Sequence, residues 1–161
     1  MEPWHYGTQL IQSIDDIKKY EPRVFGFVYF LSLYDKSGKL KYQYIGKKNL
    51  YTVRTKYLTQ TEVNAAVKKS DLKRKKTKNG WKYYKTIITE SDWIKYCSSN
   101  DFIKKNQSKF RIERKILSFW TNDSDLTLQE ATEILCQGAL NDPTFLNDSV
   151  SIRRFGSKLI R

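Results

Sequence analysis

Two adjacent segments constrain the fold more than any other part of this chain, because together they predict a β-hairpin. The first, VFGFVYFLSLY (24–34), is a run of aromatic and branched residues that is typical of a buried strand. Asp35, Lys36, Ser37 and Gly38 then form a turn sequence. The second segment, KLKYQYIG (39–46), alternates in polarity and places Leu40, Tyr42 and Tyr44 on one face. We therefore expect an antiparallel hairpin over residues 24–46.

Three helices are expected elsewhere in the chain. Apolar residues at helical spacing predict one over 9–20, which Pro22 would end. The segment SDWIKYCSS (91–99) begins with a Ser/Asp cap and predicts a second. TLQEATEILCQGAL (127–140) predicts the third and clearest helix, with Thr127 and Glu130 forming a capping box at its start. In this interpretation Asp123 and Asp125 form a turn before the helix.

Other segments are less strongly patterned. Residues 61–75 are compatible with a helix, and the very basic segment 73–85 is expected to be a mobile loop or a flap that orders on its partner. Residues 109–120 fit a helix or a strand, and we favour a strand.

The predicted fold class is α/β (α+β), with a small antiparallel sheet flanked by helices. The expected division is an N-terminal extension (1–23), a main domain (24–148) with a basic insertion at about 55–90, and a C-terminal tail (149–161).

Charge is distributed unevenly along the chain, whose net charge is +13. Between Lys36 and Lys115 there are 23 basic and six acidic residues. From Ile116 to Ile152 there is no Lys or Arg, and all the charged residues are acidic. The basic part is suited to a phosphate-rich polymer, and the acidic part to a divalent cation.

Several classes of protein are disfavoured. No run of about 18 apolar residues occurs, so we expect no membrane span, and the N-terminus lacks the pattern of a signal peptide. Cys97 and Cys136 are not in a CxxC spacing, which disfavours a zinc cluster or a disulfide framework and favours a cytoplasmic setting. His5 is the single histidine, which excludes nucleases that require several histidines.

Phosphodiester cleavage needs a base that activates water, a metal that stabilises charge, and a cation that holds the phosphate. The chain offers Tyr29 and Tyr44 on the two hairpin strands, and Glu130 in the clearest helix. Cations follow the second strand at Lys47, Lys48 and Arg54. By themselves, two tyrosines in a hairpin are more often a packing pair than a site.

An ordered set of motifs resembles the GIY-YIG nucleases. Phe27-Val28-Tyr29 stands where the first triplet falls, and Tyr44-Ile45-Gly46 matches the second. Residues 90–99 resemble the "ESDW…Y…SS" segment of the phage-borne, homing or Seg-like, group of that family. Glu130-Ala131 and Phe145-Leu146-Asn147 resemble the group's glutamate helix and its closing "YYN"-like end. The resemblance covers roughly residues 24–148.

The resemblance implies a metal-dependent endonuclease of double-stranded DNA, encoded by a phage and acting in the host cytoplasm. Tyr29 would be the general base or position the water, and Tyr44 would orient water or phosphate. Arg54, which the family places on a helix, would hold the scissile phosphate. Glu130 would be the single ligand of Mg²⁺ or Mn²⁺, supported by Asn147. No small-molecule cofactor is implied.

Departures from the family pattern leave alternatives open. The first triplet is FVY, and Arg74 or Lys48 could replace Arg54, as Glu133 could replace Glu130. The expected DNA-binding residues are the cations that follow the hairpin and those of the basic segment: Lys47, Lys48, Lys73, Arg74, Lys75, Lys76 and Lys78. Two other functions fit the same residues: a non-cleaving nucleic-acid-binding protein of this fold, and an effector or inhibitor that acts on a host nuclease.

Overall fold

The computed structural model describes residues 2–65 and 72–150 of the chain. It divides into two compact units, of which the second is Tyr51–Ser91 and the first comprises the chain up to Leu50 and from Asp92 onward. Two largely antiparallel sheets, of five and three strands, are accompanied by short helices. The predicted α+β fold class is therefore confirmed.

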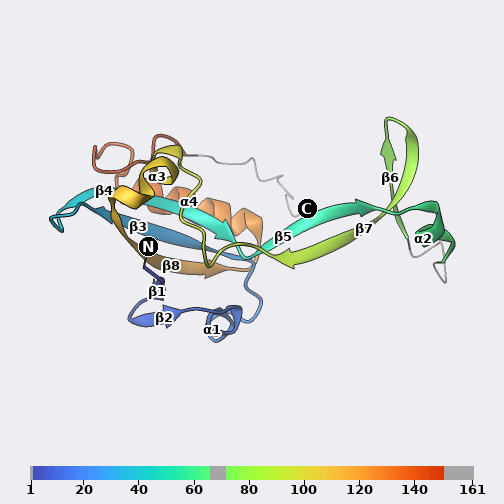
Figure 1. Cartoon of the computed structure of the whole chain (residues 1–161), viewed down its shortest axis with the longest axis horizontal. Coiled ribbons are helices and arrows are strands. Elements are labelled where there is room, and N and C mark those ends of the chain that lie inside the picture. The colour runs from blue at the N-terminus through green and yellow to red at the C-terminus, as the bar shows by residue number, and fades with distance from the viewer. Residues whose placement is uncertain (1, 66–71, 151–161) are drawn as a thin grey trace, which may run out of the picture. The chain divides into compact units, whose positions relative to one another are not determined.

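The first unit is built on the five-stranded sheet, with strand order β2-β1-β8-β3-β4 (Figure 1). Its strands are β1 (Trp4–Tyr6), β2 (Gln9–Ile11), β3 (Gly26–Tyr34), β4 (Leu40–Asn49) and β8 (Arg111–Trp120). β1 runs parallel to β8, and the other neighbouring strands are antiparallel. The hairpin predicted over 24–46 is confirmed, since β3 pairs with β4 along its whole length. The favoured strand over 109–120 is confirmed as β8.

Strand β3 is the centre of the core because it lies between β4 and β8 and is buried on both faces. Side chains alternate across a strand, so its residues divide between two layers. Phe27, Tyr29, Leu31 and Leu33 are fully buried on one face, where Trp4 makes edge contacts with Phe27 and Tyr29. Val28 lies on the other face, in a cluster with Ile45 and residues of α4 (Asp123–Cys136), which contacts β3, β4 and β8.

Two of the predicted helices of the first unit differ from the structure. Residues 9–20 form strand β2 and a short helix α1 (Ile14–Lys18), because Ser13 and Asp16 make a capping box in the middle of the segment. Residues 91–99 form turns and no regular helix. Their main contribution is to bury Trp93, whose carbonyl accepts a 2.9 Å hydrogen bond from the Trp4 indole. A helix follows later, as α3 (Asp101–Asn106), which leads into a 3₁₀ turn (Gln107–Lys109).

The third predicted helix exists as α4, but its predicted start was wrong. Asn122 is the cap, and its side chain accepts a hydrogen bond from the Asp125 backbone at 2.9 Å. Asp123 and Asp125 therefore lie in the first turn, where carboxylates are stabilised by the helix dipole, and do not form a preceding turn. Thr127 lies inside the helix and donates to the Asp123 carbonyl, so the expected capping box with Glu130 is absent.

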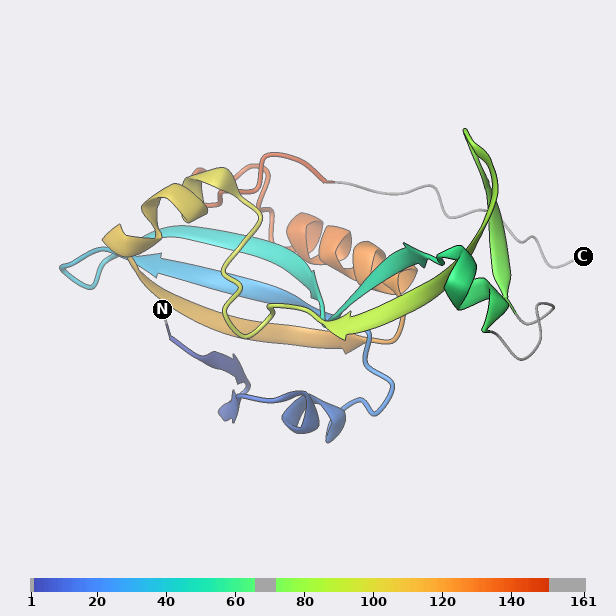
Figure 2. The same cartoon turned by 45° about the vertical axis from the view of Figure 1, so that its right-hand side comes forward.

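The second unit is a three-stranded antiparallel sheet with order β5-β7-β6 (Figure 2). Its elements are β5 (Tyr51–Tyr57), α2 (Gln60–Asn64), β6 (Lys73–Thr77) and β7 (Gly80–Glu90). The segment 73–85, expected to be a mobile loop or a flap that orders on its partner, has regular secondary structure in the chain by itself: a turn at 77–80 with Gly80 at φ +96° lets β6 and β7 pair as a hairpin. Of the helix considered over 61–75, the structure shows α2 up to Asn64 and then strand β6 from Lys73; residues 66–71 lie outside the described part.

The predicted division into an extension, a main domain and a tail stays a prediction. The N-terminal segment adds β1 to the sheet beside β8. The tail from residue 151 onward lies outside the described residues.

Candidate active site

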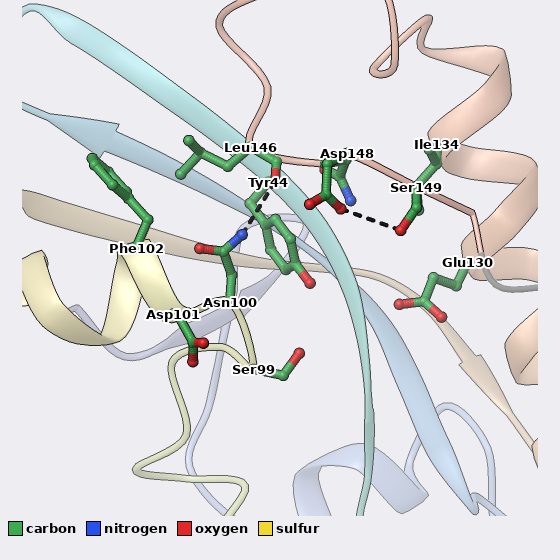
Figure 3. A pocket seen from close by; sticks show the side chains of 11 residues that line it. Tyr44, Ser99, Asn100, Asp101, Phe102, Glu130, Ile134, Leu146, Asp148 and Ser149 are labelled. Atoms are coloured by element: carbon green, nitrogen blue, oxygen red, sulfur yellow. Dashed lines mark hydrogen bonds between the residues drawn. The ribbon is translucent and has the colours of Figure 1, made fainter.

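A polar pocket of about 510 Å³ lies beside strand β4, the last strand of the five-stranded sheet. The segment 99–102, helix α4 and the segment 146–149 supply the rest of its wall. Its polar lining residues are Tyr44, Ser99, Asn100, Asp101, Glu130, Asn147, Asp148 and Ser149. Figure 3 shows the Tyr44 hydroxyl and the Glu130 carboxylate pointing toward one another across this space, with Ser99 beside them. The pocket therefore unites side chains that are about 85 residues apart in sequence.

Glu130 is a carboxylate that this environment makes hard to ionise. Burial raises its pKa above the ordinary value of 4.5, and the charge of Asp123 raises it further. The charge and the backbone N–H of Lys47 act in the opposite direction. Because desolvation penalises the charged form, a cation in the pocket would stabilise ionised Glu130.

Tyr44 is electrostatically coupled to the same carboxylate. Burial raises the pKa of the Tyr44 phenol, a hydrogen bond with Ser99 lowers it, and the charge of Glu130 raises it. The phenol therefore stays protonated at neutral pH and can donate a hydrogen bond into the pocket.

Asn147 uses its side-chain amide to hold strand β4. Its Oδ1 accepts from the Ile45 backbone N–H at 2.9 Å, and its Nδ2 donates to the Ile45 carbonyl at 2.8 Å. Backbone hydrogen bonds join Gln43 to Thr144 and Leu146 in the same way, at 2.8 and 2.9 Å. The segment 144–147 therefore pairs with the edge of β4, next to Tyr44.

Tyr29 lies beneath the YIG triplet and is 0 % exposed. It pairs directly with Gly46, where an added Cβ would lie 2.5 Å from the Tyr29 hydroxyl and 2.8 Å from Tyr44 Cε1. Only glycine leaves room for both rings, which explains the third residue of the triplet. Burial, followed by the neighbouring Tyr96 and Tyr44, raises the pKa of Tyr29 well above 10.

The Tyr29 hydroxyl has no hydrogen-bond partner of acceptable geometry in the described part of the chain. Its polar neighbours are the side chains of Ser98 and Tyr96. A buried hydroxyl without a partner is destabilising, by roughly 1–3 kcal/mol. Such unsatisfied groups call for an explanation, and a catalytic role is one of those that native structures offer.

The two lysines after the YIG triplet are engaged with protein groups. The ammonium of Lys48 lies 2.6 Å from Asp92 and 3.9 Å from the centre of the Tyr96 ring, and its side chain is 15 % exposed. The ammonium of Lys47 contacts Thr127 and lies 3.4 Å from Asp123. Both side chains therefore fix the surroundings of the pocket, and neither is among the residues that line it.

The predicted arginine, Arg54, is not among the residues that line the pocket. Arg54 lies on strand β5 of the second unit, so the expected helix after the YIG triplet is absent from its position. Its alternative Arg74 lies on β6 of the same unit. The residues that line the pocket include no Lys or Arg. The remaining predicted DNA-binding residues, Lys73, Lys75, Lys76 and Lys78, are exposed in the β6–β7 hairpin or its turn.

Sequence reasoning missed two groups of residues near the pocket. Ser99, Asn100 and Asp148 line it, and the "SS" of the ESDW segment was the signal that could have indicated Ser99.

Arg114 of β8 is only 5 % exposed and donates to the carbonyls of Glu2, Ile94 and Tyr96 at 2.6–2.9 Å. Burial lowers its pKa to about 10. Nothing in the local sequence distinguished this arginine, which holds the backbone that carries Tyr96.

The described residues contain neither a cluster of metal-binding side chains nor a helix that could span a membrane. No group of three or more His, Cys, Asp or Glu side chains lies close enough together there to hold a metal ion. Within the same ranges, no helix has the length and apolar character required to cross a membrane.

Comparison with known proteins gave one match. Residues 4–150 match the family model described as "Putative endonuclease segE, GIY-YIG domain". No curated protein and no solved structure matches the chain. The matched range contains the pocket, the paired tyrosines and the whole second unit.

Proposed function

The chain belongs to the GIY-YIG, Seg-like endonuclease family, and from this premise we propose that it is a phage-encoded, divalent-metal-dependent enzyme that hydrolyses phosphodiester bonds in double-stranded DNA. The observation that supports the proposal most directly is the pair formed by the Tyr44 hydroxyl and the Glu130 carboxylate across one pocket. The family membership by itself indicates a nuclease that acts on DNA.

The pocket suits Mg²⁺ or Mn²⁺ held by one protein ligand. Mg²⁺ commonly keeps several waters and binds through one or two carboxylates together with substrate phosphates. Glu130 would be that carboxylate, since its raised pKa reflects a buried charge that lacks full compensation. A bound ion would neutralise charge on the phosphate oxygens and on the leaving oxygen.

The protein's own groups would then have distinct roles. In hydrolysis a water oxygen bonds to phosphorus and one phosphorus–oxygen ester bond breaks. The water gives up a proton to solvent or to a nearby base, and the leaving oxygen takes up a proton to become a hydroxyl. Tyr44, as a donor in the pocket, would orient the phosphate or the water. Asn147 would act as a positioning residue through Ile45, because its amide is bound to the β4 backbone. Tyr29 is fully buried and does not line the pocket, so it would act as a positioning residue beneath Gly46 and Tyr44.

Arg54 is not among the residues that line the pocket, so its role in holding the phosphate stays a prediction. The absence of Lys and Arg from the pocket lining favours a second candidate function, a DNA-binding protein of this fold that does not cleave. The two candidates differ in one measurable property, the cleavage of DNA by the unmodified chain.

The deciding experiment compares Glu130→Gln with Glu133→Gln. Both substitutions remove one carboxylate from helix α4, but Glu133 accepts hydrogen bonds from Gln129 and Gln137 and does not line the pocket. Nicking of supercoiled plasmid is measured in Mg²⁺, in Mn²⁺ and in EDTA, and binding is measured in Ca²⁺. Glu130→Gln should lower cleavage on the order of 100-fold or more, with DNA binding retained, because it removes the ligand for the charge-neutralising ion. Glu133→Gln should cleave normally.

Other outcomes would contradict the proposal. If the unmodified chain binds DNA but cleaves it in neither Mg²⁺ nor Mn²⁺, the enzyme claim fails and the binding-only candidate stands. If it cleaves and Glu133→Gln is the inactive variant, the metal ligand is misassigned.

A further inference from the structure

The outer part of the second unit is a two-stranded ribbon. β5 pairs with β7 only over Tyr84–Glu90, whereas β6 pairs with β7 over Gly80–Tyr84. The two pairings overlap at one position, where Tyr84 lies between Tyr57 and Lys73. Residues 73–84 therefore form a hairpin of two strands, visible as the β6–β7 hairpin in Figure 1.

Strand alternation divides the cations of this ribbon between two faces. The register pairs Arg74 with Tyr83 and Lys76 with Trp81, so these four residues share one face, named here the arginine face. Lys75 pairs with Lys82, and Lys73 with Tyr84, on the opposite face, named here the lysine face. Both faces are cationic, but only one carries an arginine.

The ribbon carries charge that the protein does not neutralise within the described residues. Residues 73–84 contain six cations and no acid. No ion pair formed by any of the six occurs among the described residues, whereas Lys56 of β5 and its partner Lys85 of β7 lie 3.1 and 3.6 Å from Glu62. Like charges directly opposite one another, such as Lys75 and Lys82, destabilise a strand pair. A polyanion would relieve this repulsion.

The arginine face has the more specific chemistry. The Arg74 guanidinium lies 5.1 Å from the centre of the Trp81 ring, and Trp81 is 62 % exposed. Stacking on an aromatic ring restricts the planar guanidinium while its donors stay available. Arginine is the side chain that most often recognises the O6 and N7 acceptors of guanine in the major groove.

The width of the ribbon fits duplex DNA. Paired strands lie about 4.8 Å apart, and the major groove of B-DNA, about 12 Å wide, admits a two-stranded ribbon. The major groove of duplex RNA is deep and narrow, and side chains do not enter it. The geometry points to one mode of binding: we propose that the β6–β7 ribbon enters the major groove of duplex DNA with its arginine face toward the bases. This inference rests on the proposed function for the identity of the polymer.

The test removes two charges from one face or from the other. Arg74→Ala/Lys76→Ala alters the arginine face, and Lys75→Ala/Lys82→Ala alters the lysine face of the same ribbon. Binding of the full-length chain to a labelled DNA duplex is measured by fluorescence anisotropy in EDTA, so that cleavage plays no part. The arginine-face variant should lose about tenfold or more in affinity, and clearly more than the lysine-face variant. Circular dichroism should show that both variants are folded.

Three polymers of the same sequence complete the test: duplex DNA, duplex RNA and single-stranded DNA. We expect the duplex DNA to bind best, and the difference between the two variants to disappear on duplex RNA. Equal losses from both faces, or a greater loss from the lysine face, would overturn the inference. It would also be overturned if single-stranded DNA bound best and Trp81→Ala caused the main loss, since base stacking would then be the mode of binding.

The two proposals can fail separately. If the chain cleaves plasmid while its two face variants bind alike, the proposed binding mode of the ribbon is refuted and the proposed endonuclease activity stands. If the chain binds through the arginine face and never cleaves, the endonuclease activity is refuted and the binding mode stands.

Discussion

At the scale of single residues, Glu130 shows how a buried carboxylate lowers the stability of its own fold when it is ionised. Its pKa is raised by burial, so the folded chain binds the Glu130 proton more tightly than the unfolded chain does. Protonated Glu130 therefore contributes to the free energy of unfolding. This contribution is fully present below the ordinary glutamate pKa and is lost as the pH rises through the raised pKa. At neutral pH the ionised carboxylate is therefore destabilising until a cation joins it.

Glu130→Gln should accordingly be more stable than the parent at neutral pH without metal. The gain should shrink as the pH falls toward 4.5, the ordinary pKa of the group, because the parent is then protonated as well. Melting temperatures between pH 4 and pH 8 in EDTA measure this. Mg²⁺ should stabilise the parent, by about 1.4 kcal/mol at ten times its Kd, and leave Glu130→Gln unchanged. A variant less stable than the parent at pH 7 would show that Glu130 has a structural role.

At the scale of elements, the edge of β4 shows how a segment without regular secondary structure can extend a sheet. An exposed strand edge presents unpaired backbone groups that must find partners. Here Gln43 pairs with Thr144 and Leu146 through the backbone, and Ile45 pairs with the Asn147 amide. The backbone N–H of Lys47, further along the same strand, lowers the pKa of Glu130. The same edge therefore positions Tyr44 and Glu130 in one pocket.

Asn147→Ala should weaken the attachment of the segment 144–147 to the edge of β4. Loss of both hydrogen bonds leaves the Ile45 N–H and carbonyl without these partners, at a cost of about 1–3 kcal/mol. Chemical denaturation measures the loss, and hydrogen exchange should be faster at the Ile45 amide. Asn147→Asp keeps an acceptor for the Ile45 N–H but no donor for its carbonyl, so it should restore only part of the stability.

Asn141→Ala, an exposed asparagine nearby in the chain, is the control and should change little. If Asn147→Ala matches this control in stability and in exchange at Ile45, the amide does not hold the strand.

At the scale of the whole molecule, positive charge is denser in the second unit than in the first. Residues 51–91 hold eleven of the chain's 30 Lys and Arg residues and three acids. The pocket, with Glu130, Asp101 and Asp148, belongs to the first unit. DNA affinity and catalysis are thus expected from different units, because phosphate contacts dominate affinity while a metal site needs carboxylates.

Removing the second unit tests this separation. Tyr51 and Glu90 are direct partners at the base of β5 and β7, so an Asn-Gly turn can replace residues 52–89 between them. The shortened chain should fold, because the core around β3 lies in the first unit. Its affinity for duplex DNA should fall steeply. The slope of the logarithm of affinity against the logarithm of salt concentration, measured from about 50 to 300 mM, should become shallower. The change should be about 0.9 for each DNA phosphate that the shortened chain no longer neutralises. Unchanged affinity and salt dependence would place the DNA-binding surface in the first unit.

Local patterns in the sequence determined the central hairpin and the existence of helix α4, whereas residues 109–120, which form β8, fitted a helix or a strand. The hairpin depends on the apolar run of β3, the turn residues and the alternation in β4. The ordered motifs determined the family, which the match over residues 4–150 confirms. Local patterns also misled where tertiary contacts prevailed. Residues 91–99 bury Trp93 in place of forming a helix, and the basic segment 73–85 forms a strand pair.

Only the tertiary structure decided how the candidate site is assembled. Tyr44, Glu130 and Asn147 meet because helix α4 and the segment 144–147 both pack along β4, about 85 and 100 residues away in the chain. No local periodicity encodes such contacts, since they depend on how separate apolar faces bury one another. The same packing buries Tyr29 under Gly46, engages Lys47 and Lys48 with nearby carboxylates, and leaves Arg54 on a strand of the second unit.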